Sequence, residues 1–392
     1  MTAPQIIVAG HICLDIIPAF APLPGGLEAL LVPGKLIEVG AAVVATGGPV
    51  SNTGLALHRL GVPVALMGKV GDDLFGKAVL DVFNSYGPQL AGGMIVAPGE
   101  QTSYSVVINP PGVDRIFLHC PGANDTFSAA DVAYDRLRVA KVFHFGYPPL
   151  MRRMYADDGR ELAEIMRRVR SLGLTTSLDM AMPDPAAPAG RACWPSLLRR
   201  VLPHVDVFAP SLEEILFMLD RDRFTAISEG RSVADGRLLA EVSDCLLTMG
   251  AAVVALKLGD QGLYLRTTAD RLRLRDAGPG IPDGDWVGRE MLAPCFAVDV
   301  VGTTGSGDCT IAGLLAAMVA GLSPRDAVNA AVAVGACNVE AADAVGGIRP
   351  WKEVRQRIAA GWSRREVAIL LPAWRRDEAK GLMIGPGDRN GT

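Results

Sequence analysis

Short runs of apolar and β-branched residues alternate along the chain with longer segments whose apolar positions recur at helical spacing. The runs that we expect to form strands are Ile6 to Ala9, Val64 to Gly68, Val142 to Phe145, Thr175 to Asp179, Val205 to Ala209 and Val253 to Leu258. The segments that we expect to form helices are Asn52 to Leu60, Leu74 to Tyr86, Asp158 to Ser171 and Leu212 to Leu219. This alternation predicts an α/β fold, a doubly wound and mostly parallel sheet with helices on both faces. Ligands of such sheets bind at the carboxyl ends of the strands, so we expect the functional site there.

Two stretches depart from this alternation and predict a separate β element. Residues 35–45 and 101–119 are rich in strand-forming residues and show little helical spacing. The second stretch contains the turn Asn109-Pro110-Pro111-Gly112 between two apolar runs, which is typical of a hairpin. We expect the two stretches together to form a small sheet that stands off the main body.

The C-terminal third contains two segments of irregular composition. Residues 267–293 are rich in Gly, Pro, Asp and Arg, which predicts a long excursion or a hairpin with an extended loop. Residues 372–392 carry charge, Gly and Pro without apolar spacing, and we expect them to form a surface tail. Residues 1–371 are predicted to form one domain.

The composition is that of a globular protein. Of the 392 residues, 49% are hydrophobic and 20% are charged, which supplies ample material for a core. The mean hydropathy of +0.27 comes from short apolar runs. The longest of them, residues 311–322, falls short of the ~20 apolar residues that a membrane span requires. No basic stretch precedes the first apolar run, so we expect no secretory signal.

Net charge and cysteine content indicate which kinds of binding partner and which cellular compartment to expect. With 38 basic and 42 acidic residues the net charge is −4, and no basic block is long enough to follow a nucleic-acid backbone. The seven cysteines are scattered, odd in number and without a CxxC pair, which disfavours a disulfide framework and a zinc site. We therefore expect a cytoplasmic protein that binds neither nucleic acid nor membrane.

The strongest chemical pattern is the small-residue loop Gly302-Thr303-Thr304-Gly305-Ser306-Gly307-Asp308. It follows a predicted strand, residues 296–301, and opens a predicted helix, residues 309–321. Such a loop presents free amides and the positive end of the helix dipole, which suit a phosphoryl group in transfer. No lysine follows the glycines, so the loop is not a Walker A motif. Asp308 beside this pocket would serve as a base toward an attacking hydroxyl; the alternative is a tight turn with Asp308 near the N-cap.

Two motifs resemble those of a known family. The loop that ends at Asp308 resembles the C-terminal signature D-T-x-G-A-G-D of the ribokinase/PfkB carbohydrate kinases. Gly47-Gly48-Pro49-Val50-Ser51-Asn52 resembles the family's G-G-x-x-x-N motif. Further segments that fall in the family's order are Gly10 to Asp15, Gly71 to Gly76, Pro121 to Asn124 and Lys257 to Gly262. The ordered set identifies the chain as a member of this family over roughly residues 4–360.

The resemblance implies a ribokinase-like fold whose small sheet is a lid, and an enzyme that phosphorylates a hydroxyl of a sugar or sugar-like molecule with ATP. Asp308 matches the catalytic base of the family, and the amides of Gly305, Ser306 and Gly307 would form its anion hole. For the substrate, the resemblance implies that Asp15 hydrogen-bonds hydroxyls. It also implies that the sugar pocket is lined by Gly47, Gly48 and Asn52. Local alternatives are a turn role for Asp15 and a helix N-cap role for Asn52.

The same resemblance implies a groove for ATP with Mg²⁺. The residues that it assigns to the nucleotide are Lys257, Gly259, Gly262, Thr303 and Thr304. Glu214, which ends the family's N-x-x-E motif, would act on Mg²⁺ through water.

The chain departs from the family pattern at several positions. Gly302 stands where the signature begins with Asp, and Ser211 stands where the N-x-x-E motif begins with Asn. Pro49 and Gly146 stand where the members most like ribokinase have Lys and Glu. We therefore do not expect ribose held in the ribokinase manner.

Other functions stay open on sequence alone. The same fold would serve a nucleoside or vitamin-alcohol kinase, and a non-catalytic sugar-binding sensor would keep the pocket without turnover. Pairing of two lids into a homodimer is also open. The histidines show no ligand spacing and were assigned no chemistry: His11, His58, His119, His144 and His204.

Overall fold

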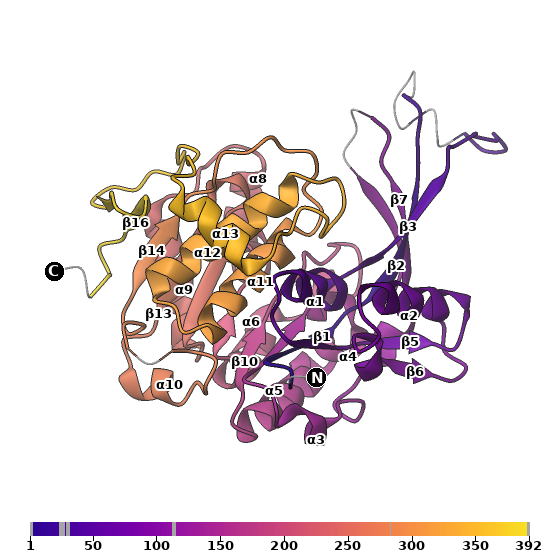
Figure 1. Ribbon diagram of the computed structural model, residues 1–392, viewed down its shortest axis with the longest axis horizontal. Helices are drawn as coiled ribbons and strands as arrows, with labels where there is room; N and C mark the ends of the chain where they lie inside the picture. The colour runs from indigo at the N-terminus through magenta and orange to yellow at the C-terminus, as the bar shows by residue number, and fades with distance from the viewer. Residues whose placement is uncertain (1–2, 23–27, 29–31, 112–114, 283, 390–392) are drawn as a thin grey trace.

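A ten-stranded sheet forms the centre of the computed structural model, which describes residues 3–22, 28, 32–111, 115–282 and 284–389 (Figure 1). In spatial order its strands are β15 (Arg375–Asp377), β16 (Leu382–Ile384), β14 (Glu290–Ala293), β13 (Leu263–Thr267), β12 (Val253–Lys257), β11 (Val207–Phe208), β10 (Thr175–Leu178), β9 (Val142–Gly146), β1 (Ile6–Gly10) and β4 (Val64–Met67). The strands from β12 to β4 are parallel, whereas β13, β14, β16 and β15 continue the sheet antiparallel. The doubly wound α/β prediction is confirmed.

Helices cover both faces of the sheet because its strands are apolar on both sides. Within β1, Ile6 and Val8 point into one core and Ile7 and Ala9 into the other. The first core is covered by α1 (Pro49–Arg59), α2 (Leu74–Tyr86), α10 (Arg271–Arg275), α11 (Ser306–Val319), α12 (Pro324–Val339) and α13 (Trp351–Ala359). The second is covered by α4 (Arg152–Tyr155), α5 (Arg160–Ser171), α6 (Trp194–Val201), α7 (Leu212–Leu219) and α9 (Gly236–Thr248). Smaller elements are β5 (Lys69–Gly71), β6 (Ile95–Ala97), α3 (Tyr134–Leu137) and α8 (Arg221–Ser228).

One predicted strand is wrong. Residues 296–301 are irregular apart from a single bridge between Phe296 and Arg364. Val300 and Val301 are more than half exposed, so this apolar run is a surface segment and not a buried strand. The helix after it, α11, begins at Ser306 instead of Cys309, which places Asp308 in its first turn.

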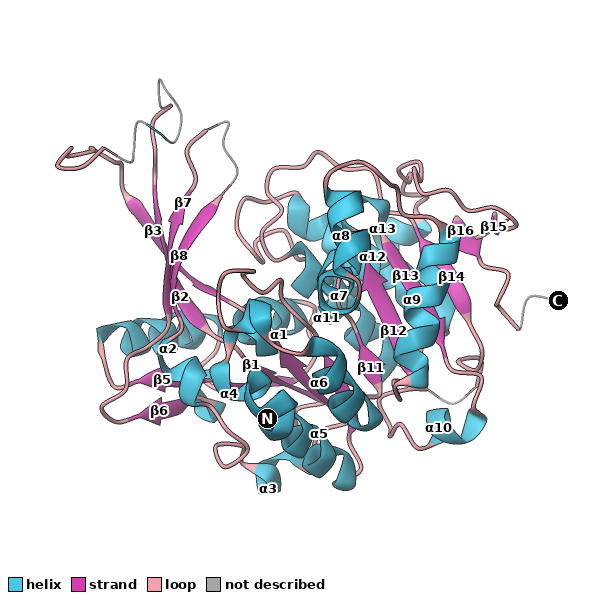
Figure 2. Cartoon of the chain, turned by 180° about the vertical axis from the view of Figure 1, so that it is seen from behind, coloured by secondary structure: helices cyan, strands magenta, loops and turns pink. Residues whose placement is uncertain are grey.

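The lid is a four-stranded sheet that stands apart from the main body (Figures 1 and 2). Its order is β3 (Ala42–Gly47), β2 (Cys13–Pro18), β7 (Tyr104–Ile108) and β8 (Ile116–Cys120). The prediction placed a lid in these regions but missed β2, and residues 35–41 lie outside any strand. β2 was missed because only His11 and Ile12 separate it from β1, and a local pattern cannot show that the chain changes sheets there. Of the predicted turn, Gly112 lies outside the described residues.

The lid exposes large apolar side chains to solvent on both of its faces. The most exposed among them are Val43, Val44, Phe117 and Leu118. Pairing of two lids stays a prediction.

The described part of residues 267–293 supplies the extended loop and the second strand of a hairpin, in agreement with the expectation. β13 and β14 pair antiparallel, and the connection carries α10. Trp286 of this connection is 2% exposed, so the loop packs onto the body.

The predicted surface tail is wrong for the residues that the structure describes. β16 pairs with β14 and extends the main sheet, and Leu382 and Ile384 are fully buried. Leu382 and Ile384 alternate with Met383 at the period of a strand, but the alternation spans only three residues. It is therefore too short to detect in the sequence among the charged and glycine residues around it.

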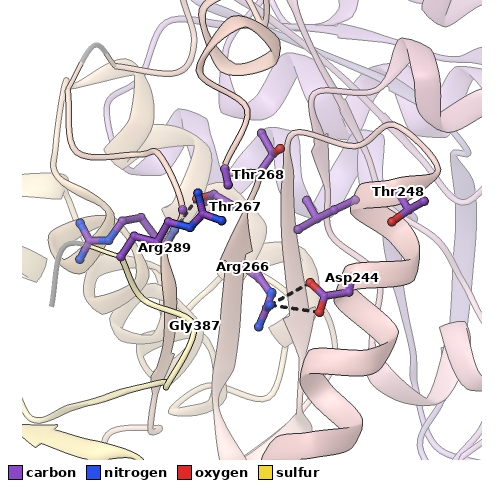
Figure 3. Close-up of a pocket in the computed structure, with 11 residues that line it drawn as sticks. Asp244, Thr248, Arg266, Thr267, Thr268, Arg289 and Gly387 are labelled. Atoms are coloured by element: carbon purple, nitrogen blue, oxygen red, sulfur yellow. Dashed lines mark hydrogen bonds and ion pairs between the residues drawn. The ribbon is translucent and has the colours of Figure 1, made fainter.

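A polar cluster holds this C-terminal segment to the sheet. Arg289 Nε donates to Asp388 Oδ2 at 3.0 Å, and both side chains are at most 3% exposed. Beside it, Arg266 pairs with Glu290 and with Asp244 on α9, as Figure 3 shows for the second pair. A hollow of about 500 Å³ lies here, at the amino ends of the parallel strands. Since Arg266 and Arg289 are paired with carboxylates, we interpret the cluster as structural.

No helix among the described residues is long and apolar enough to span a membrane.

The Arg289–Asp388 pair yields a stability prediction. Asp388→Ala would leave the buried guanidinium without its carboxylate, which we expect to lower the free energy of unfolding by about 3 kcal/mol. Urea denaturation measures the change. The control is Arg376→Ala, which removes an exposed pair with Glu378 and should change the stability by less than about 0.5 kcal/mol. Equal effects of the two variants would show that the C-terminal segment does not depend on the buried pair.

Candidate functional site

Polar residues gather at the carboxyl ends of the parallel strands, and only one of them, Lys257, was predicted from the sequence. His11 follows β1, Tyr147 follows β9, Asp179 follows β10, and Lys257 ends β12. Above them lie the N-terminal ends of α1 and α11, which pack against each other. This is the edge at which ligands bind in sheets of this topology.

Asp308 is the centre of the site. Its carboxyl group is 2% exposed, and its Oδ2 accepts hydrogen bonds from Asn52 Nδ2 at 2.9 Å and from the Tyr147 hydroxyl at 2.8 Å. Thr53 Oγ1 lies 3.4 Å from Oδ1. Burial raises the pKa of Asp308, while these donors and Lys257 oppose that rise. The group is therefore a buried carboxyl whose basicity exceeds that of an exposed aspartate.

Tyr147 reaches Asp308 from an unusual backbone conformation. Its φ is 62°, in the left-handed region that few non-glycine residues adopt. Burial, followed by the neighbouring Asp308 charge, raises the pKa of its hydroxyl well above the usual value, so the hydroxyl stays a donor. Strained backbone of this kind is concentrated at functional sites.

The small-residue loop forms the anion-binding end of the site. Gly305 is the N-cap of α11 with φ 71°, and Ser306, Gly307 and Asp308 are the first helical residues. The Ser306 amide already donates to Thr303 O at 3.3 Å. The amides of Gly305 and Gly307 have no partner among the described backbone groups, as expected at the start of a helix. Two of the three predicted amides are thus free for an anion.

Lys257 lies beside this loop. Its Nζ is 2.6 Å from Asp179 Oδ1, and its side-chain stem packs so closely that a Cβ on Gly307 would approach it to 3.3 Å. Burial has the largest single effect on the pKa of Lys257 and lowers it, but the nearby carboxylates Asp179, Glu214 and Asp308 together outweigh burial, and the net shift is upward. Burial raises the pKa of Asp179. A cation is therefore held within the carboxylate cluster, next to the free amides.

Glu214 has a structural role as well as its predicted one. Its Oε2 accepts from the Ser211 amide at 2.7 Å, and its own amide donates to Ser211 Oγ at 3.1 Å. This capping box explains why Ser is suitable at position 211. Within the described residues no cluster of three or more ligand side chains could hold a metal by itself. The buried Oδ2 of Asp179 has no hydrogen-bond partner among the described residues.

The residues predicted to bind substrate lie on two lid strands and at the start of α1. Asp15 on β2 is adjacent to Gly47 and accepts a hydrogen bond from the Cys13 thiol at 3.2 Å. Gly48 has φ 85°, and a Cβ there would come within 2.6 Å of His11 Nδ1, so only glycine fits this position. Burial raises the pKa of Asp15. Asn52 was expected to contact substrate, but its amide donates to Asp308, and only its Oδ1 remains without a partner.

An apolar cleft of about 250 Å³ lies on the other side of the loop. Four of the residues predicted to bind nucleotide line it, namely Lys257, Gly259, Gly262 and Thr303. Its apolar wall includes Val298, Val300, Val332 and Val339. The exposed apolar run at residues 296–301 is therefore one wall of this cleft.

The lid reaches the anion loop through Arg115, which precedes β8. Its guanidinium donates to Thr303 Oγ1 at 3.2 Å and also to Thr304 Oγ1. This contact joins segments 188 residues apart in the chain and brings a positive charge to the free amides.

Sequence reasoning missed several residues of the site: His11, Arg115, His119, Tyr147 and Asp179. Three of them, His11, Tyr147 and Asp179, lie within two residues of the end of a predicted strand, which is a usable signal in a parallel sheet. Nothing local distinguishes Arg115 or His119, because the lid brings them to the site only in three dimensions.

Comparisons with known proteins agree with this geometry. The model of the pfkB family carbohydrate kinases matches residues 5–350. Among curated proteins, a 2-dehydro-3-deoxygluconokinase of Bacillus subtilis is 25% identical over 79% of this chain and 85% of its own length. Fructokinase-2 of Oryza sativa is 26% identical, over 80% of this chain and 79% of its own. The structure of Arabidopsis thaliana ribokinase with ribose and ATP superposes with a TM-score of 0.67 at 19% identity, over 91% of this chain and 98% of that one.

The hydrogen bond from Tyr147 yields a titration prediction. A donor to a carboxylate favours its charged form, so Tyr147→Phe should raise the pKa of Asp308 beyond its already raised value. Carboxyl ¹³C chemical shifts against pH measure it. The control is Tyr134→Phe, since the Tyr134 hydroxyl has no hydrogen-bond partner in the described structure and its ring packs on Arg168. An unchanged Asp308 titration in Tyr147→Phe would contradict the contact.

Proposed function

The chain belongs to the pfkB family of carbohydrate kinases, which phosphorylate a sugar with ATP, and we propose that Asp308 is the base of this reaction. The observation that carries the proposal is the position of a buried carboxyl, with raised pKa, in the first turn of a helix whose N-terminus has free amides. A proton acceptor and an anion site are thereby adjacent, which is what transfer of a phosphoryl group to a hydroxyl needs.

The reaction follows from these positions. The substrate hydroxyl lies beside Asp308 and gives up its proton to that carboxylate as its oxygen forms a bond to the γ-phosphorus of ATP. The bond from this phosphorus to the β–γ bridging oxygen breaks, and ADP leaves. The raised pKa makes Asp308 a better proton acceptor than an exposed aspartate would be. Asn52 and Tyr147 hold the carboxylate toward the substrate.

Negative charge that develops on the γ-phosphoryl group would meet three kinds of donor. The amides of Gly305 and Gly307 point out of α11, and each such donor is worth about 3 kcal/mol in other enzymes. Lys257 supplies a buried positive charge next to Gly307. Arg115 supplies a second charge from the lid, through a fork that suits phosphate oxygens.

The nucleotide would occupy the apolar cleft beside the loop. Val298, Val300 and Val332 offer a surface on which a purine ring would replace water, and Lys257 at the other end would meet the triphosphate. Mg²⁺ bound with ATP would neutralise the phosphate oxygens. Asp179 and Glu214 are the carboxylates that would hold it through water.

Lid closure would keep water away from the γ-phosphoryl group, since water competes as acceptor. The bridge from Arg115 to Thr303 makes the closed lid part of the phosphoryl site.

Asp308→Asn tests the base. The amide keeps the size of the side chain and can accept from Asn52 and Tyr147, so we expect normal folding and ATP affinity. Without a proton acceptor, kcat should fall by about 10²-fold or more. ADP release measures kcat, and calorimetry measures ATP binding. Asp81→Asn, an exposed change on α2, is the matched control. Near-normal turnover of Asp308→Asn would remove this residue from the mechanism.

Arg115→Ala tests the lid cation. We expect kcat to fall by about 10²-fold, as for loss of one oxyanion donor. ATP hydrolysis without sugar phosphorylation should rise relative to transfer, because the closed lid is weakened. Arg115→Lys should recover part of kcat, since the charge is kept without the fork. Arg138→Ala, an exposed arginine on the main body, is the control. Wild-type kcat and coupling in Arg115→Ala would mean that the contact with the anion loop has no catalytic role.

A further inference from the structure

The hollow of about 500 Å³ at the amino ends of the parallel strands has more basic than acidic side chains in its wall. The ionisable residues that line it are Arg266, Arg289, Arg389 and Asp244 (Figure 3). Three arginines against one aspartate leave the wall with two positive charges in excess. The other carboxylates of the cluster, Glu290 and Asp388, lie behind the wall with their side chains 3% and 1% exposed. The hollow itself therefore presents mainly positive charge.

Arg389 is the arginine of the hollow that no carboxylate holds. Among the described residues, no hydrogen bond or ion pair involves its side chain, whereas Arg266 and Arg289 are both paired. Its backbone is nevertheless fixed, because its amide donates to Gly288 O at 2.8 Å. Its stem lies against the bare backbone of Gly288, where a Cβ would approach Arg389 Cδ to 2.9 Å. The exposed guanidinium is thus anchored at the hollow and available to a ligand.

Two threonines add neutral donors to the hollow. Thr248 ends α9, and its hydroxyl has no hydrogen-bond partner among the described residues. Thr268 Oγ1 accepts from the Asp270 amide at 3.1 Å, so its own hydrogen is left to donate. A guanidinium together with hydroxyl donors suits an anion that has several acceptor oxygens.

The charge and the size of the hollow favour a phosphate ester over other anions. A phosphate monoester carries about two negative charges at neutral pH and three strong acceptor oxygens, which match the excess charge of the wall. A carboxylate carries one charge and would offset half of that excess. Small-molecule sites have volumes of about 300–1,000 Å³, and the hollow lies within this range.

The hollow is remote from the catalytic site. In the pair of β12 with β13, Thr267 of the hollow is opposite Val253, whereas Leu263 is opposite Lys257. Four strand residues of about 3.3 Å each separate these two ends, which is roughly 13 Å. A compound in the hollow is therefore not the one that receives the phosphoryl group.

We infer that the hollow is a second ligand site, which binds a small phosphate ester through Arg389, Thr248 and Thr268. The paired arginines Arg266 and Arg289 supply positive potential and a rigid wall, since carboxylates fix their positions. The site goes beyond the kinase function proposed above and does not depend on it, because no catalytic residue lines the hollow.

Calorimetry on the purified full-length chain tests the site. Glycerol 3-phosphate is the probe, glycerol is its uncharged counterpart, and glycerate is its carboxylate counterpart. A saturating non-hydrolysable ATP analogue with Mg²⁺ is added first, so that the anion loop of the catalytic site does not compete for the probe.

We expect one molecule of glycerol 3-phosphate to bind per chain, at least tenfold more tightly than glycerol or glycerate. Failure of the probe to bind would overturn the inference. Equal binding of glycerate would also overturn it, because the site would then not distinguish a phosphate from a carboxylate.

Two variants locate the probe. Arg389→Ala removes the unpaired guanidinium and should weaken binding of glycerol 3-phosphate at least tenfold. Thr248→Glu places a second carboxylate in the wall and should weaken it by at least as much. The matched control is Arg375→Ala, which removes an exposed arginine of β15 that does not line the hollow, and it should leave binding unchanged. Full binding in Arg389→Ala, or an equal loss in Arg375→Ala, would show that the hollow does not hold the phosphate.

Discussion

The arrangement of the site depends on the burial of one carboxyl group. Asp308 is almost completely removed from water, and a buried carboxylate is costly unless donors surround it. Those donors come from Asn52 on α1 and from Tyr147 after β9, and the first turn of α11 adds the positive end of its dipole. The close packing of α1 against α11, and the left-handed backbone of Tyr147, are therefore both tied to this group. A site built in this way is rigid before any ligand binds, which reduces the reorganisation needed during reaction.

Around Asp308 the site divides into two halves of different charge. The phosphoryl half contains Lys257, Arg115 and the free amides of α11, which suit an anion. The half toward the lid contains the carboxyl of Asp15 and the histidines His11 and His119, whose pKa values burial lowers. Asp308 lies between the two halves, where the proton of a substrate hydroxyl would be accepted.

Two additions to the main sheet have different physical roles. The lid carries Arg115 and His119 to the site and leaves apolar side chains exposed on both of its faces. The C-terminal strands β15 and β16 lie at the opposite edge of the sheet from the lid and are held by the buried Arg289–Asp388 pair. The lid therefore contributes side chains to the site. The strands β15 and β16 stabilise the main sheet by extending its antiparallel part beyond β14.

The sequence by itself determined the α/β class, the six parallel strands, the lid regions and the loop with Asp308, because these depend on local spacing and on short motifs. It was wrong about residues 296–301 and 372–392. An apolar run that lines a cleft is indistinguishable in sequence from a buried strand, and a three-residue strand such as β16 has too short a period to recognise. Only the tertiary structure decided which donors surround Asp308, that Lys257 pairs with Asp179, and that His11 faces His119. These contacts join positions that are tens to hundreds of residues apart, and whether a buried polar atom has a partner depends on all the segments packed around it.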